Sequence, residues 1–479
     1  MSASSPTGVL RWMTQPAAAR LARRVRVALR AARRRGRPAL VSVSCPVGSS
    51  VDPTAVVCAA RKPSDRWFCL EQRDRDGAAL AALGSLVALE SSGEGRFAVL
   101  AARWRALARE ALADEAEGPP GSGLVAVGGF AFASDGGASS DWAPFSPASV
   151  VVPELSLARL GAAVRLTVNA LVAPDDTEAD VAGRIERRLA GMAAAATLPL
   201  SDPAPVGEHR VFSPLAPAHY EEAVARAVQR IRAGELEKVV LAREVEVHAP
   251  APYDPGALLG LLREAFPSCY VYAVGRGDAT FLGATPELLV RCEGQRATTV
   301  ALAGSSRRSS DPAVDDHLGE QLLRSEKDRQ ENAIVARRIA RALAPHSVWV
   351  TVAPEPVVAR VANIQHLATP IRAQLAAPVD ALELAGRLHP TPAVGAEPAA
   401  ALELIPALEG IDRGWYAGAV GWCDSSGDGE LCVALRCALL RGRRARCYAG
   451  CGIVRDSDPA DELAETEVKL AAMLAALLP

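Results

Sequence analysis

Residues 234–248 have the sequence GELEKVVLAREVEVH, which predicts the end of a helix followed by a β-strand. Gly234 closes a preceding segment, residues 219–235, whose apolar side chains recur with helical spacing. From Lys238 onward, valine and leucine dominate a short run of the kind that forms strands. The stretch therefore predicts a helix that leads into a strand, with a lysine at the start of that strand.

The rest of the C-terminal half continues this alternation of elements. A long helical pattern covers residues 317–343, and a last helix begins near Asp458, a candidate N-cap, with Pro459 at its first position. Further strands are expected at CYVYAV (269–274), TFLGATPELLVRCEG (280–294), RATTVALAG (296–304), WVTVAP (349–354), GWYAGAVGWCD (414–424), LCVALRCALLRG (431–442) and ARCYAGCGIV (445–454). Many strands with helices between them predict the α+β class and not a doubly wound sheet.

The chain is longer than a usual single-core domain, so it should be composite. The proline- and glycine-punctuated stretch APVGEHRVFSPLAP (204–217) suggests two portions, 1–205 and 206–479. We expect the first to be an α+β portion integrated with the core, and the second to be the catalytic domain. The net charge of −2, and the lack of any long apolar run, give no sign of a nucleic-acid partner or a membrane. No glycine-rich nucleotide-binding motif follows a strand.

The cysteines and the N-terminus bear on the cellular compartment. Ten scattered cysteines without CxxC spacing predict free, mostly buried thiols in a reducing cytoplasm. Many arginines and no acidic residue precede Asp52, a composition also found in organelle targeting segments. Because alanine and arginine dominate the whole chain, we favour an amphipathic surface helix that leads into a strand at PALVSVSCPV (38–47).

Lysine is rare in this chain, and its positions are therefore informative. Of 53 lysines and arginines, only four are lysine: Lys62, Lys238, Lys327 and Lys469. Arginine stays protonated in proteins, whereas lysine can serve as a base where its site favours the neutral form. A lysine in a chain so biased toward arginine is a candidate for such a role, and Lys238 is the first candidate.

Two acidic residues on the predicted helix 317–343 occupy unusual positions. Asp328 and Glu331 extend the apolar stripe that includes Val335 and Ile339, so they should face the interior or a cleft. A buried carboxylate needs a partner, a proton or a metal. The alternative is an ordinary ion pair with one of the arginines on the same helix, which are Arg324, Arg329 and Arg337.

The last helix repeats the arrangement. Glu462, Glu465 and Lys469 project from one side of it, beside an apolar stripe formed by Leu463, Leu470, Leu474 and Leu477. The alternative is a solvated Glu465–Lys469 pair of the common i,i+4 kind. If the two acidic pairs meet across a cleft, they form an all-oxygen site that suits Mg²⁺.

An ordered series of motifs identifies a family resemblance. The motifs are EKVVLARE, FLGATPELL, ALAG, SEKDRQEN, NIQHLATPI, LHPTPAVG, RGWYAGAVGW, DGELCVALRCALL, YAGCGIV and SDPADELAETEVKL. They resemble the chorismate-utilising enzymes, most closely the isochorismate synthases, and cover residues 210–479 densely. The resemblance implies two stacked antiparallel sheets with helices outside, a Mg²⁺ ion and the conversion of chorismate to isochorismate. In that reaction water adds at ring carbon 2 while the hydroxyl group at carbon 4 leaves.

The resemblance also implies roles for individual residues. Lys238 matches the general base that activates water, and Glu287 matches the general acid for the departing hydroxyl group. Glu331 and Glu465 match the metal carboxylates, with Asp328 and Glu462 as neighbours that bind through water. The matched positions around the substrate are Gly304, Ser305, His366, Ala393, Tyr416, Arg436, Gly450, Gly452 and Lys469. Arg436 has the planar fork that suits a substrate carboxylate.

The chain departs from the family pattern at three positions. Ser305 stands where a threonine is common and keeps the hydroxyl group. Ala396 replaces a glycine and would cost about 1 kcal/mol if that position needs positive φ. Asn332 stands where histidine is common, so a contact behind the metal carboxylates could differ.

The relatives leave several alternatives for the activity. Salicylate synthases share the lysine and then eliminate pyruvate, although Ala393 favours the pure isomerase. The aminating anthranilate and aminodeoxychorismate synthases need ammonia and typically lack this lysine, so no glutamine amidotransferase subunit is expected. A non-catalytic homologue is disfavoured by the intact acid, base and metal positions. We expect a cytoplasmic monomer whose product feeds menaquinone or siderophore synthesis.

Overall fold

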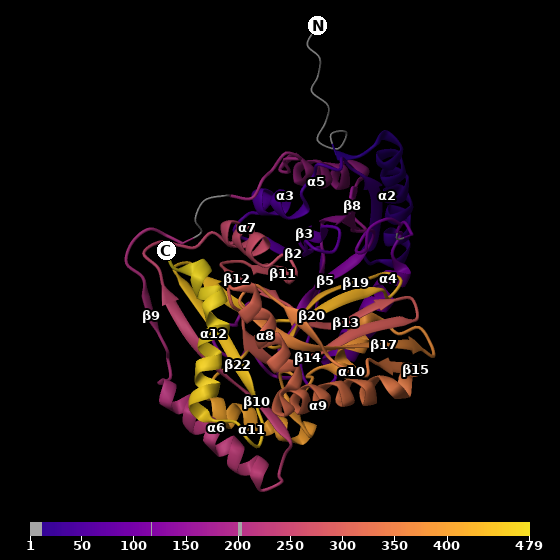
Figure 1. The fold of residues 1–479 in the computed structure, drawn as a ribbon. Helices are drawn as coiled ribbons and strands as arrows, with labels where there is room; N and C mark the ends of the chain where they lie inside the picture. The colour runs from indigo at the N-terminus through magenta and orange to yellow at the C-terminus, as the bar shows by residue number, and fades with distance from the viewer. Residues whose placement is uncertain (1–11, 116, 200–203) are drawn as a thin grey trace.

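Two large antiparallel sheets form the core of the protein, with helices packed around them (Figure 1). The computed structural model describes residues 12–115, 117–199 and 204–479. This is the α+β architecture that the sequence predicts. No helix in these ranges is long and apolar enough to span a membrane.

The first sheet has an N-terminal and a C-terminal half. Its N-terminal strands, in spatial order, are β1 (Ala39–Pro46), β8 (Ala163–Val172), β7 (Leu155–Leu160), β3 (Ala78–Leu83) and β2 (Arg66–Gln72). Its C-terminal strands follow as β11 (Tyr270–Arg276), β12 (Ala279–Thr285), β21 (Cys437–Arg441), β22 (Arg444–Ile453), β10 (Lys238–His248) and β18 (Ala396–Glu397), with β9 (Arg210–Phe212) also on β10. The halves join where β2 pairs with β11.

The second sheet is divided in the same way. In spatial order it contains β15 (Ser347–Val352), β17 (Ile364–Leu375), β14 (Arg296–Arg307), β13 (Leu288–Glu293), β20 (Gly429–Val433), β19 (Ala419–Asp424), β5 (Val125–Phe130), β6 (Ala148–Val152) and β4 (Val87–Ser91), with β16 (Val357–Arg360) also on β17. Here the two portions of the chain join where β5 pairs with β19. Both sheets thus contain strands from each side of residue 205.

The helices cover the sheets and their ends. They are α2 (Gln15–Arg35), α3 (Pro53–Ala60), α4 (Arg96–Glu110), α5 (Glu178–Ala190), α6 (Pro217–Arg232), α7 (Pro255–Ala265), α8 (Pro312–Arg324), α9 (Glu326–Leu343), α10 (Ala381–Leu388), α11 (Leu404–Glu409) and α12 (Pro459–Leu477). Two 3₁₀ turns cover Ala344–His346 and Ala399–Glu403. The expected N-terminal amphipathic helix is confirmed as α2, which packs on β1 through one apolar face. All ten cysteines are buried and unpaired.

Two segments that we predicted as single strands each divide between the two sheets. TFLGATPELLVRCEG forms β12 in the first sheet and β13 in the second, and the chain crosses at Pro286 and Glu287. LCVALRCALLRG likewise forms β20 and β21, and crosses at 434–436. Pro286 has no N–H group for a ladder, which ends β12. The two crossings are bonded to each other, since Val433 N donates to Glu287 O (3.0 Å) and Ala284 N donates to Arg436 O (3.1 Å).

The predicted long helix at 317–343 is also two elements. Ser325 has extended backbone (φ −65°, ψ 115°), so it ends α8 and caps α9, and its side chain accepts from Asp328 N. For α12 the predicted cap is confirmed, because the Asp458 side chain accepts from Ala460 N and Asp461 N. The break at Ser325 sets α9 against β14 and β17.

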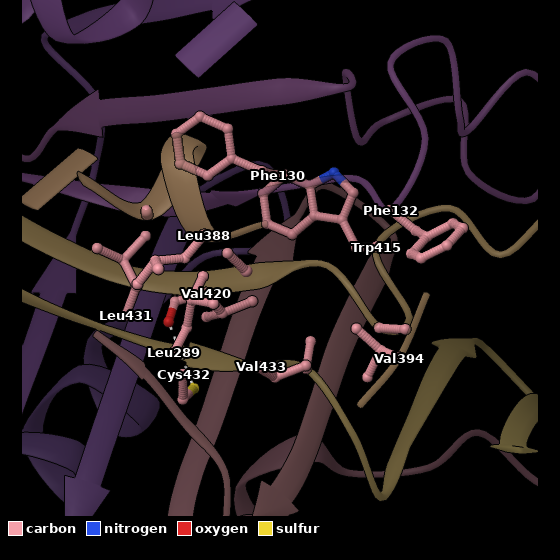
Figure 2. Close-up of a cluster of buried hydrophobic side chains, with 14 of the residues drawn as sticks. Phe130, Phe132, Leu289, Leu388, Val394, Trp415, Val420, Leu431, Cys432 and Val433 are labelled. Carbon is pink, nitrogen blue, oxygen red and sulfur yellow. Dashed lines mark hydrogen bonds between the residues drawn. The ribbon is translucent and has the colours of Figure 1, made fainter. Parts of the chain in front are cut away.

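The main core lies between the sheets near the crossings. Figure 2 shows Phe130 and Trp415 beside aliphatic side chains of β19 and β20, including Val420 and Leu431. These side chains are almost completely buried, and the Trp415 indole donates to Ser146 O (2.9 Å). Burying large apolar surface of this kind is the main favourable contribution to folding. The core therefore provides a rigid support for the residues at the crossings.

Candidate active site

A cavity of about 70 Å³ lies where the chain crosses between the sheets. It has room for several water molecules. The predicted site residues that line it are Glu287, Gly304, Ser305, Glu331, His366, Ala393, Tyr416, Arg436, Gly450, Gly452, Glu465 and Lys469. Residues from distant parts of the sequence thus meet at one place, as their motifs predict.

Lys238 lies behind the cavity wall instead of on it. Its side chain has no exposed surface, and its Nζ is 2.8 Å from Glu331 Oε1. Gly452 leaves the space for this lysine, because a Cβ atom there would come within 2.6 Å of Lys238 Cε. In this structure Glu331, which lines the cavity, is therefore the carboxylate that holds the Lys238 amine.

The alternative of ordinary ion pairs on α9 is wrong. The three arginines that could have paired with Asp328 and Glu331 bind other carboxylates, Arg324 with Glu320, Arg329 with Glu355 and Arg337 with Glu237. Asp328 instead packs against Gly304, whose φ of +78° and close approach to the Asp328 side chain exclude larger residues. Burial, opposed by a hydrogen bond from Ser325 and reinforced by Glu331, raises the pKa of Asp328.

Glu465 and Lys469 form the predicted i,i+4 pair, but they do so at the cavity. Lys469 Nζ is 2.6 Å from Glu465 Oε1 and also donates to Gly450 O (2.9 Å). Ser305 Oγ donates to the same Glu465 oxygen at 2.7 Å. Burial alone would raise the pKa of Glu465, but Lys469 and Ser305 lower it to about 2. Glu465 is therefore an anion at any physiological pH.

Glu462 does not flank the packed face of α12, as we predicted, but lies on it. The buried stripe runs through Glu462, Thr466, Leu470 and Met473, whereas Leu463 and Leu474 are only half-buried. Lys327 Nζ donates to Glu462 Oε1 (3.1 Å). Burial and the neighbouring Glu465 raise the pKa of Glu462. The prediction from the leucine positions put the buried face in the wrong place, because Glu462 and Thr466 also lie on that face.

Arg436 lies at the second crossing with a backbone conformation that arginine rarely adopts. Its φ is +48°, a strain that is common at functional sites. Arg436 Nη2 donates to His366 Nε2 (3.2 Å), while His366 Nδ1 faces Gly304 O (3.3 Å). The Nδ1 atom therefore carries the proton and Nε2 accepts. Burial and the nearby Arg436 and Lys469 lower the pKa of His366 to about 3, so the ring is neutral.

Glu287, at the first crossing, is buried next to this cationic wall. Its backbone N–H donates to Thr285 Oγ1 (3.2 Å), which fixes the turn after Pro286. Burial raises its pKa to about 8, against the opposing effect of Lys238, Lys469 and Arg436. Glu287 is thus a carboxylic acid that keeps its proton at neutral pH.

Replacing Glu287 by glutamine is expected to flatten the pH dependence of stability. Between the ordinary carboxyl pKa of 4.5 and the folded value of about 8, the folded protein binds more protons than the unfolded chain. The stability from protonated Glu287 is complete below this window and is lost as pH rises through it. The Tm of the wild type should therefore fall relative to Glu287→Gln as pH rises from about 5 to about 8.

The control for this measurement is Glu293→Gln, which changes an exposed carboxylate on the neighbouring strand β13. Its Tm curve should run parallel to that of the wild type. A wild-type curve that also stays parallel to Glu287→Gln would show that Glu287 ionises normally in the folded protein.

Two departures from the family pattern have structural outcomes. Ala396 lies in β18 opposite Val239 and is not among the residues with positive φ, so the expected strain does not arise. Asn332 is buried and joins α9 to both adjacent strands. Its Nδ2 atom donates to the carbonyl groups of Ala301, Ala303 and Leu367, and its Oδ1 accepts from Thr369 Oγ1. Asn332 therefore fixes the rotation of the helix that carries Glu331.

Comparisons with known proteins agree with this geometry. The profile of a family described as "Chorismate binding enzyme" matches residues 27–478. The "Salicylate biosynthesis isochorismate synthase" of Pseudomonas aeruginosa is 38% identical, over 92% of this chain and 90% of that protein. The "Isochorismate synthase MenF" of Bacillus subtilis is 35% identical, over 74% and 75%. The structure of MenF, the menaquinone-specific isochorismate synthase from Escherichia coli, superposes with a TM-score of 0.76 at 26% identity, covering 95% of this chain and all of that one.

Proposed function

Because the chain belongs to the chorismate binding enzymes, we propose that it is an isochorismate synthase, which converts chorismate to isochorismate. The observation that carries the proposal is that a buried lysine, Lys238, and a buried, protonated glutamate, Glu287, lie at the same cavity, one behind its wall and one on it. Lys238 is the base that takes a proton from the attacking water, and Glu287 is the acid that protonates the departing hydroxyl group. Arginine at 238 could not serve, because it does not give up its proton.

Arg436 and Lys469 hold the carboxylate groups of the substrate. Chorismate is a dicarboxylate, and these two cations lie on the cavity wall with the neutral His366 between Arg436 and Gly304. His366 keeps the guanidinium oriented without adding a charge of its own. The strained backbone at Arg436 is then explained by the need to aim its planar fork into the cavity.

The carboxylates fit a magnesium ion. Glu331 and Glu465 supply oxygen atoms on the cavity wall, and Asp328 and Glu462 lie behind them. Hard cations such as Mg²⁺ take oxygen ligands and keep several waters, which suits two direct carboxylates and two outer ones. Cys451 Sγ is also within 4.8 Å of Glu462 and Glu465, but it donates to Glu462 O. The ion would supply positive charge that binds a substrate carboxylate and would draw Glu331 away from Lys238.

Purified protein incubated with chorismate and Mg²⁺ is expected to yield isochorismate. No pyruvate should be released, and neither glutamine nor ammonia should be needed. The product can be separated by reversed-phase chromatography and identified by NMR, with pyruvate measured by a coupled lactate dehydrogenase assay. Glu287→Gln serves as the matched inactive control. Stoichiometric pyruvate would assign the chain to the salicylate synthases, and strict dependence on ammonia would assign it to the aminating enzymes.

A further inference from the structure

A buried ion pair lies directly behind the wall of the cavity. Glu409, at the end of α11, and Arg413, in the turn before β19, are 3% and 4% exposed. Arg413 Nε donates to Glu409 Oε2 at 2.9 Å, and its Nη2 donates to Glu409 Oε1. Glu409 Oε1 also accepts from Ala242 N at 2.6 Å. The pair is almost completely shielded from solvent and is not part of the acid, base or metal positions.

The remaining donors of Arg413 join two segments that are far apart in the sequence. Nη2 donates to Val240 O on β10 (2.9 Å), and Nη1 donates to Val394 O in the loop before β18 (2.8 Å). The guanidinium also contacts two aromatic rings, at 5.8 Å from the centre of the Tyr416 ring and 4.1 Å from that of the Phe132 ring. Figure 2 shows Phe132 and Val394 grouped beside Trp415.

The residues that Arg413 joins all belong to the cavity. Val240, Val394 and Tyr416 line it. Val240 follows Lys238 by two positions on β10, so their side chains project to the same face of the strand. Val240 N donates to Gly395 O (2.7 Å), which ties β10 and the 394–395 loop a second time. One guanidinium thus sets the spacing between the lysine strand, the loop and Tyr416.

Stability alone does not account for a charged pair at this place. Hydrophobic residues of similar volume often stabilise a core as well as a buried ion pair does, since the pair loses its hydration. What the guanidinium adds is direction, because its planar fork fixes several acceptors at once. Direction matters most where reacting groups must be held within fractions of an ångström.

We propose that Arg413, clamped by Glu409, is a positioning residue that holds Lys238 and the cavity wall in register. The inference rests on the proposed function for its catalytic readout, but not for its structural one. Arg413→Lys keeps the charge beside Glu409, but its single ammonium group does not reproduce the planar fork that holds Val240 O and Val394 O together.

Arg413→Lys is expected to lower kcat by about 10- to 100-fold with a smaller change in KM for chorismate. The matched control is Arg263→Met, which removes another arginine that bridges two carboxylates, Asp52 and Glu71, away from the cavity. Arg263→Met should lower Tm and leave kcat near that of the wild type. Both variants are assayed well below their Tm, so that the folded enzyme is compared.

Hydrogen exchange gives the readout that does not depend on turnover. In Arg413→Lys the amides of Val240 and Ala242 should exchange faster, whereas Arg263→Met should leave them protected. Unchanged kcat or unchanged exchange in Arg413→Lys would overturn the inference, as would an equal loss of kcat in Arg263→Met. If the wild type makes no isochorismate, the proposed function fails, and the exchange data still decide whether Arg413 holds these segments.

Discussion

Replacement of Lys238 by arginine is expected to lower kcat by about 10²–10⁴. Arginine keeps the positive charge beside Glu331 but cannot act as the neutral base. If Lys238 only anchored Glu331 or a substrate carboxylate, arginine would substitute tolerably and would affect mainly KM. If Lys238 is the base, the kcat of Lys238→Ala should be only slightly lower than that of Lys238→Arg.

Two controls separate chemistry from packing in this experiment. Lys62→Arg makes the same substitution at an exposed lysine outside the cavity and should leave turnover unchanged. Lys238 is completely buried and fits only because position 452 is a glycine, so the Tm of Lys238→Arg must be measured beside that of Lys238→Ala, which introduces no bulk. Near-native turnover in a folded Lys238→Arg enzyme would remove Lys238 from the role of base.

Glu465→Gln and Glu331→Gln are each expected to lower kcat by about 10²–10³, because each would remove a charge from the proposed Mg²⁺ site. EDTA should abolish wild-type turnover, and Mg²⁺ should restore it. A ligand that binds only the folded state stabilises the protein against unfolding. Mg²⁺ should therefore raise the Tm of the wild type and not that of Glu465→Gln. This thermal shift tests the metal site without any assay of activity.

The two variants should differ in stability. Glu331→Gln leaves the fully buried Lys238 without its carboxylate, a change that destabilises strongly. Glu465→Gln leaves Lys469 with its bond to Gly450 O and should cost less. Glu326→Gln, an exposed position in the first turn of α9, is the control and should retain both activity and the thermal shift. Normal activity in Glu465→Gln would mean that its carboxylate serves only as the partner of Lys469.

Much of this arrangement could be predicted from local patterns. The strand from Lys238 to His248 and the cap at Asp458 appear where valine-rich runs and Asp-Pro signals place them. The resemblance to the chorismate-utilising enzymes predicted most of the residues that line the cavity, because the motifs that carry them occur in the same order. The strand pattern and the cap signal each depend on residues that are close together in the sequence.

The points that could not be predicted depend on tertiary contacts. Apolar residues continue on both sides of Pro286 and through Ala434. Pro286 is a local signal that a strand ends, but it does not show that the chain enters the other sheet. Glu462 was predicted to flank an apolar stripe because the sequence does not reveal that it is buried and paired with Lys327 at the surface.

Arg413 is a single arginine before the Gly-Trp-Tyr run. Of the two carbonyl groups that accept from it, that of Val240 is 173 residues away along the chain and that of Val394 is 19. Its spacing of four residues from Glu409 is the local signal that could have drawn attention to it.

The positions of the lysines have a practical consequence for chemical modification. Lys238 is buried against Glu331, and Lys469 is bonded to Glu465 and Gly450 at the cavity, whereas Lys62 and Lys327 are both exposed. Amine-reactive esters acylate exposed amines first, so Lys62 should react before Lys327, whose amine is bonded to Glu462, and well before Lys238 and Lys469. The protein can then be tethered to a surface or given a fluorophore by ordinary amine coupling, at a point that is remote from the cavity.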